Sequence, residues 1–222
     1  MEYPNTLVEK NAVNHTPVIR FFAQLFSYIF HPLFIPLYVG YYLVFINPDY
    51  FTGINDKEKT WIILRVILNM IFFPALTVLL LKGVGFIESV FLRIQKDRII
   101  PYMAAGLFYF WMYLVFHNQP ELPLIITSFV FGVFLASSVG LIANIYFKIS
   151  MHAIGCGGMV GLMLIILKTG SSVITLPLVV VILICGIVCT SRMIVSDHTQ
   201  KDIYLGLLFG FFCQYISAAF IL

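Results

Sequence analysis

The apolar run 169-TGSSVITLPLVVVILICGIVCTS-191 decides the fold class of this chain. It contains no Asp, Glu, Lys or Arg, and a helix needs about 20 predominantly apolar residues to cross a bilayer. Four further runs without these charged residues have comparable length, and they occupy 21–48, 99–120, 122–147 and 203–222. The sequence therefore carries several candidate membrane spans.

The composition supports the same conclusion. Of the 222 residues, 61% are hydrophobic and 10% are charged, and the mean hydropathy is +0.99. Soluble domains carry roughly 25% charged residues. We therefore predict an all-α fold, a polytopic membrane helix bundle of about six to seven transmembrane helices that forms a single integral membrane domain over 1–222. The expected spans are 21–47, 61–81, 101–117, 122–147, 151–168, 173–191 and 202–222.

The first apolar run is interrupted by His31, Pro32 and Pro36. Proline disrupts a helix because it lacks an N–H and its ring clashes with the preceding turn. The pattern predicts a kinked or broken first helix, or alternatively an interfacial stretch near 18–30. On this interpretation His31 is a kink residue.

Glycines are concentrated in two places along the C-terminal half. They occur in 155-GCGGMVG-161 and as Gly206 and Gly210, which form a GxxxG pattern. Small residues at this spacing let helix backbones approach closely in a membrane. We expect each helix that carries such a pattern to pack closely against a neighbouring helix.

Counting spans brings three polar clusters to the same membrane face. With seven spans, the connections 82–100, 148–150 and 192–201 all lie on one side, and the connections 48–60, 118–121 and 169–172 lie on the other. The first side then holds most of the ionisable groups. A site assembled from helix ends needs this arrangement, although Lys and Arg also collect at membrane interfaces without any further role.

The cluster 191-SRMIVSDHTQKD-202 combines His198 with Asp202 four residues later. On a helix these side chains share a face, so the carboxylate can accept an imidazole N–H and leave the other ring nitrogen as a nucleophile or base. The alternative is structural. Thr199 and Asp202 also match a capping box, in which Asp202 only caps the last helix.

The other two clusters are 148-KISMHAIG-155 and 93-RIQKDRIIP-101. Ser150 is a candidate N-cap that places His152 in the first turn of a span, where N–H groups and the helix dipole attract anions. Three cations stand directly before the expected span 101–117, namely Arg93, Lys96 and Arg98. The structural alternatives are an ordinary cap with an interfacial histidine, and a collar of interfacial cations.

Together these groups suit phosphoryl transfer through a phosphohistidine. Cations neutralise the phosphate oxygens, one histidine attacks the phosphorus, and a second protonates the leaving oxygen. No histidine and carboxylate spacing suggests a metal site, so the expected mechanism uses no metal and no other cofactor. The +3 net charge is dispersed over loops, which does not support nucleic acid binding.

The pattern Ser191-Arg192, His198 and Asp202 resembles the SR-x5-H-x3-D motif of the type 2 phosphatidic acid phosphatase superfamily. The family's PSGH motif is matched in part by Ser150 and His152, with isoleucine and methionine at the proline and glycine positions. In its K-x6-RP motif, arginine and isoleucine stand at the lysine and arginine positions before the proline. The departures are Ile149 and Met151 in the second motif and Arg93 and Ile100 in the first.

The resemblance covers roughly 90–215, within a core of about 61–222, and it implies a role for each matched residue. His198 is the nucleophile, Asp202 orients it, and His152 is the general acid that later activates water. The implied phosphate-binding residues are Arg192, Ser150, Arg98, Lys96 and Arg93.

The resemblance implies a multi-pass phosphatase of the inner (cell) membrane of a bacterium. Its substrate would be a lipid phosphate or pyrophosphate, whose tail remains in the bilayer. The alternative is a non-catalytic relative that binds or moves an anionic lipid, motivated by the departures at Ile149, Met151 and Ile100.

Overall fold

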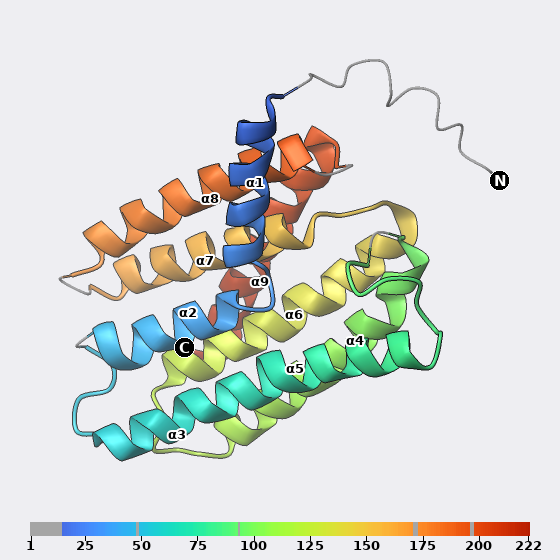
Figure 1. Cartoon of the computed structure of the whole chain (residues 1–222). Coiled ribbons are helices and arrows are strands. Elements are labelled where there is room, and N and C mark those ends of the chain that lie inside the picture. The colour runs from blue at the N-terminus through green and yellow to red at the C-terminus, as the bar shows by residue number, and fades with distance from the viewer. Residues whose placement is uncertain (1–14, 48, 93, 171–172, 196–197) are drawn as a thin grey trace.

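The structure is a computed structural model that describes residues 15–47, 49–92, 94–170, 173–195 and 198–222. Within these ranges every regular element is a helix (Figure 1). The elements, with η marking π- or 3₁₀-helical segments, are α1 (Pro17–Ile29), α2 (Ile35–Tyr41), η3 (Tyr42–Ile46), α3 (Asp56–Val66), η4 (Ile67–Phe72), α4 (Phe73–Gly83), η5 (Lys96–Arg98), α5 (Ile99–His117), α6 (Leu124–Tyr146), α7 (Met151–Lys168), α8 (Thr175–Val195) and α9 (Gln200–Ile221).

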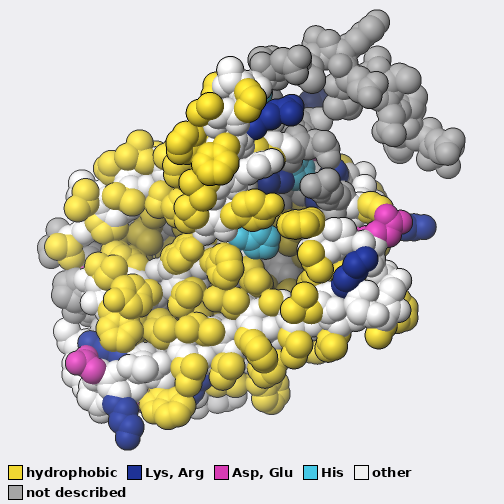
Figure 2. All heavy atoms as spheres, viewed as in Figure 1, with side chains coloured by type: hydrophobic (Ala, Val, Ile, Leu, Met, Phe, Trp, Pro, Cys, Tyr) yellow, Lys and Arg dark blue, Asp and Glu magenta, His cyan; other side chains and the backbone are white. Residues whose placement is uncertain are grey.

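Six continuous helices in the described ranges are long and apolar enough to cross a membrane. They are Asp56–Gly83, Lys96–His117, Leu124–Tyr146, Met151–Lys168, Thr175–Val195 and Gln200–Ile221. The space-filling view shows an apolar surface with charged side chains mainly toward the two ends of the bundle (Figure 2). The predicted all-α polytopic membrane helix bundle is confirmed, and the chain is a multi-pass integral membrane protein.

The second span begins earlier than the predicted 61–81, at Asp56. The Asn55 side chain accepts a hydrogen bond from the Glu58 N–H at 2.9 Å, and two acidic residues occupy the first turn. Both features stabilise the positive end of a helix. Hydropathy alone misses this turn because its capping residues are polar.

The first apolar run is broken between Ile29 and Ile35, as predicted. Helix α1 runs across α7 and α8 instead of along them (Figure 1). The Tyr38 hydroxyl donates to the Ile29 carbonyl at 2.8 Å and so satisfies an acceptor at the end of α1. The break allows α1 to turn across the bundle, and the Tyr38 hydrogen bond holds it there.

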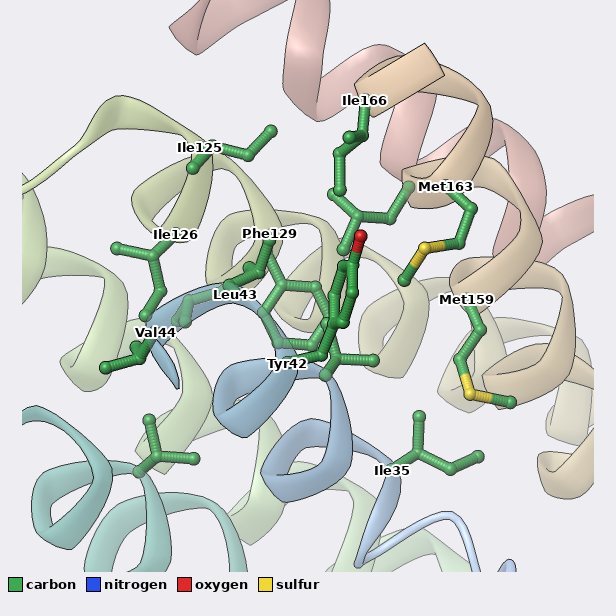
Figure 3. Close-up of a cluster of buried hydrophobic side chains, with 14 of the residues drawn as sticks. Ile35, Tyr42, Leu43, Val44, Ile125, Ile126, Phe129, Met159, Met163 and Ile166 are labelled. Carbon is green, nitrogen blue, oxygen red and sulfur yellow. The ribbon is translucent and has the colours of Figure 1, made fainter. Parts of the chain in front are cut away.

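The short helix formed by α2 and η3 enters the centre of the bundle. At 1.5 Å per residue it is about 18 Å long, less than the roughly 30 Å hydrocarbon layer. Its side chains pack against α6 and α7 in one buried cluster (Figure 3). The labelled members are Ile35, Tyr42, Leu43 and Val44 with Ile125, Ile126, Phe129, Met159, Met163 and Ile166. This core anchors the chain directly after the break.

Helices α7 and α9 are in backbone contact. A Cβ on Gly210 would lie 1.9 Å from the Ile154 carbonyl oxygen, and one on Gly157 would lie 2.0 Å from the Leu207 carbonyl oxygen. The expected close packing of the glycine-bearing helices is confirmed. This packing also brings together the N-terminal ends of α7 and α9, which adjoin the polar clusters 148–155 and 191–202.

Candidate functional site

The three predicted polar clusters meet at the loop 147–150, between α6 and α7. An Arg98 guanidinium nitrogen donates to the Ile149 carbonyl at 3.4 Å. The Ser150 N–H donates to the Asp202 carbonyl, also at 3.4 Å. Backbone groups of this loop thus bind both the segment before α5 and the start of α9, and the clusters lie at one end of the bundle as expected from the span count.

His198 is held by the backbone of the same loop. Its Nδ1 lies 3.0 Å from the Lys148 carbonyl oxygen, and its side chain is only 3% exposed. Because a carbonyl oxygen can only accept, Nδ1 carries the proton in this hydrogen bond. The neutral ring therefore keeps a lone pair on Nε2, the nitrogen required for nucleophilic attack.

Asp202 has a different first partner from the one implied by the family resemblance. Its Oδ2 accepts from the Thr199 N–H at 2.8 Å, while the Thr199 hydroxyl accepts from the Asp202 N–H at 3.3 Å. This is the capping box that the sequence offered as the structural alternative. The same oxygen lies 4.0 Å from His198 Nδ1, beyond hydrogen-bond distance, so Asp202 fixes the start of α9 that carries His198 and does not bind the imidazole directly.

His198 is neutral at physiological pH. Burial of its ring, followed by the positive charges of Arg192 and Arg98, lowers its pKa from 6.5 to about 4. The hydrogen bond to the Lys148 carbonyl opposes this shift, and the Lys148 ammonium adds to it. A neutral imidazole is the form of histidine that can attack phosphorus.

This lowered pKa makes the stability of the protein depend on pH. In the unfolded chain His198 binds its proton near pH 6.5, whereas the folded protein resists protonation until about pH 4. Stability is therefore full above about pH 6.5 and is lost as the pH falls toward 4, by about 3 kcal/mol from this residue at 1.36 kcal/mol per pKa unit. Thermal unfolding of the detergent-solubilised protein at pH 7 and pH 4.5 measures the loss. The His198→Asn variant should show a smaller loss than wild type, and equal losses would contradict the assignment.

His152 occupies the first turn of α7, where the Ser150 hydroxyl accepts from the Ala153 N–H at 3.4 Å and caps the helix. His152 Nε2 lies 3.0 Å from the Ser27 carbonyl oxygen on α1, so Nε2 is the donor in that bond. The remaining nitrogen, Nδ1, is left for proton transfer. Helix α1 thus contributes directly to the site.

The cations divide into separate positions. Arg192 is half-buried in the last turn of α8, close enough for its charge to act on His198. Arg98 is 7% exposed, and its Nε donates to the Leu92 carbonyl at 2.7 Å. Leu92 has a left-handed φ of 48°, so this bond supports a turn that is unfavourable for leucine. Arg98 therefore holds backbone groups together at the site.

The other residues predicted to bind phosphate are Ser150, Lys96 and Arg93, and none of them has a described contact with the two histidines. Ser150 is fully buried, so a phosphate reaches its hydroxyl only if loop 147–150 moves. Lys96 is exposed on η5, and its side chain makes no hydrogen bond or ion pair with the described part of the chain. Arg93 lies outside the described residues.

Two residues that the sequence interpretation did not assign to the site belong to this neighbourhood. Ser27 provides the carbonyl that binds His152. The His31 ring lies 5.4 Å from the His152 ring, centroid to centroid, at an interplanar angle of 83°. The only sequence signal for His31 was an imidazole in an apolar run, which proline-induced kinking explained equally well.

The site chemistry is that of histidines and guanidinium groups. Among the residues that the structure describes, no group of three or more His, Cys, Asp or Glu side chains is placed to hold a metal ion. Comparisons with family models, with curated proteins and with solved structures give no match to this chain. The functional argument therefore depends on the geometry of the site.

Proposed function

We propose that this protein is a membrane phosphatase that removes phosphate or pyrophosphate from a lipid, through a phosphohistidine formed on His198. The observation that carries the proposal is the hydrogen bond between His198 Nδ1 and the Lys148 carbonyl, which leaves the Nε2 lone pair for attack. A bacterial inner membrane as the location is part of this proposal.

The reaction proceeds in two balanced steps. In the first, His152 takes up a solvent proton on Nδ1 as the phosphate binds, because its Nε2 already carries one. His198 Nε2 then bonds to phosphorus, the bond from phosphorus to the leaving oxygen breaks, and His152 gives that oxygen the proton from Nδ1. In the second, His152 Nδ1 takes a proton from water, the hydroxide attacks the phosphohistidine, and inorganic phosphate leaves with His198 regenerated. Nδ1 is the active nitrogen of His152 because Nε2 is bound to Ser27.

Positive charge at the site supports phosphate binding. The family resemblance assigns this role to Arg192, Ser150, Arg98, Lys96 and Arg93. Arg192 fits it best, because its charge already acts on the nucleophile, whereas the Arg98 guanidinium binds two backbone carbonyls. A guanidinium beside phosphate stabilises the charge on the equatorial oxygens during transfer.

A groove on the bundle surface supports a lipid as the substrate. It has a volume of about 330 Å³ and lies between α5 and α6, with Tyr102, Leu107, Phe110 and Phe134 among its lining residues. Tyr102 is one helical turn from Arg98, so the groove starts beside the site. An acyl chain in this groove would keep the tail in the bilayer while the phosphate reaches the helix ends.

The second candidate function is non-catalytic binding or movement of an anionic lipid. Two observations favour it: the fully buried Ser150 hydroxyl, and the hydrogen bonds of Arg98 to two backbone carbonyls. The phosphatase family that the sequence resembles has glycine at the position of Met151, and glycine lets the backbone approach a phosphate closely. Met151 adds a side chain at this position.

Phosphate release from a panel of lipid phosphates tests the proposal. The panel contains phosphatidic acid, phosphatidylglycerol phosphate and a polyprenyl diphosphate, and the protein is purified in nanodiscs. We expect release from at least one lipid, inhibition by vanadate, no effect of chelators, and an acid-labile phosphoenzyme on rapid quenching. Saturable binding of these lipids with no release over long incubation would instead support the second candidate function.

A further inference from the structure

His31 lies beside the general acid, at the break between α1 and α2. Its ring meets the His152 ring edge to face at 5.4 Å and 83°, and the Phe34 ring at 6.2 Å and 65°. His31 is an exposed residue, whereas the His152 residue and the His198 side chain are almost completely buried. His31 is therefore the most accessible of these three histidines.

The backbone at the break fixes which His31 nitrogen carries the proton. The Leu33 N–H donates to His31 Nδ1 at 3.3 Å, so Nδ1 is the acceptor. The neutral ring then carries its proton on Nε2 and presents a hydrogen-bond donor. Although part of the residue is exposed, protein atoms packed around the ring, followed by the charge of Arg192, lower the pKa of His31, and the ring is neutral at physiological pH.

Two further contacts hold this part of the chain against the site. His152 donates to the Ser27 carbonyl on α1, and Tyr38 on α2 donates to the Ile29 carbonyl at the end of α1. His31 follows both carbonyls in the sequence and precedes Tyr38. Its ring is therefore positioned by the same contacts that orient His152.

We propose that His31 is a third histidine of the phosphate site and donates its Nε2–H to an oxygen of the bound phosphate. The inference rests on the proposed function, because it takes a phosphate group as the ligand. Arg192 is the cationic partner at the same place, since its charge acts on both His31 and His198. A neutral donor beside a guanidinium suits a phosphate oxygen, because it adds a hydrogen bond without bringing another buried charge.

Asparagine and glutamine at position 31 separate this role from a role in shaping the break. The asparagine side-chain oxygen can accept the N–H two residues later, as His31 Nδ1 does from Leu33, but asparagine has no donor at the Nε2 position. Glutamine is longer and can place an amide N–H near the Nε2 position, while it supports the turn less well. Phosphate binding should therefore rank wild type, then His31→Gln, then His31→Asn.

The experiment measures binding of inorganic phosphate to the full chain in nanodiscs, with histidine ¹⁵N resonances as the readout. In wild type, phosphate should shift the His31 Nε2 resonance, which is assigned by its loss in the variants. His31→Asn should weaken phosphate binding about tenfold or more, since a hydrogen bond to a charged group is worth about 1.5–3 kcal/mol. Its thermal unfolding midpoint should stay near that of wild type.

The outcomes for His31 and for catalysis are separable. If wild type binds phosphate but hydrolyses no lipid, and His31→Asn binds it more weakly, the role of His31 stands and hydrolysis fails. If wild type hydrolyses lipid phosphate and His31→Asn binds phosphate equally well, or better than His31→Gln does, the role of His31 is overturned and hydrolysis stands. A wild-type protein that binds no phosphate overturns the role of His31, and hydrolysis is then decided by phosphate release from the lipid panel alone.

Discussion

Replacing His198 with asparagine should lower phosphate release from the lipid substrate by about a thousandfold or more and abolish the trapped phosphoenzyme. Loss of a covalent nucleophile removes the reaction path itself, and comparable losses are typical where a nucleophile or its base is deleted. The asparagine amide can donate to the Lys148 carbonyl in place of Nδ1, which retains the contact between the start of α9 and loop 147–150. The fold is therefore preserved while the Nε2 lone pair is lost.

The matched control is His117→Asn. His117 is an exposed histidine at the C-terminal end of α5, at the opposite end of the bundle from the site. Both variants remove one imidazole, but only the His198 change should affect turnover. The measurements are initial rates of phosphate release and the amount of acid-labile phosphate on the protein after quenching. A His198→Asn protein that releases phosphate at the wild-type rate would rule out the phosphohistidine mechanism.

Hydropathy was sufficient to predict six of the seven expected spans, because each helix that crosses the bilayer must be apolar over most of its length, whereas the expected span 21–47 is divided into α1 and the shorter helix of α2 and η3. The position of each polar cluster followed from counting those spans. The contacts within the site could not be predicted in the same way. His198 binds the Lys148 carbonyl and Arg98 binds the Ile149 carbonyl, and a backbone carbonyl is present at every residue. No residue pattern identifies which of them will be used.

The contribution of the first helix was missed for a related reason. The residues Ser27 and His31 reach the site only because α1 turns across the bundle after the break. The prolines predicted the break, but they carry no information on the direction that the chain takes after it. That direction is decided by tertiary contacts, such as the Tyr38 hydroxyl with the Ile29 carbonyl and the packing of α2 between α6 and α7.

Replacing Gly210 with alanine should prevent α7 and α9 from packing and lower stability by more than about 3 kcal/mol. The added Cβ would lie 1.9 Å from the Ile154 carbonyl oxygen and 2.8 Å from the Gly158 nitrogen, and both are backbone atoms that no rotamer change can move. The helices would have to separate, which would also pull the Asp202 carbonyl away from the Ser150 N–H. The site should therefore be lost together with the fold.

The control for this change is Gly186→Ala in α8. A Cβ on Gly186 meets no heavy atom within 4 Å, so alanine there should be neutral or should stabilise the helix by up to about 1 kcal/mol. Thermal unfolding midpoints and the yield of monodisperse detergent-solubilised protein distinguish the two glycines. A Gly210→Ala protein that melts at the wild-type temperature would mean that α7 and α9 are not in backbone contact. Without that contact, only the hydrogen bonds from loop 147–150 to Asp202 and His198 would hold the start of α7 beside the capped start of α9, so the same measurement also tests the basis of the site.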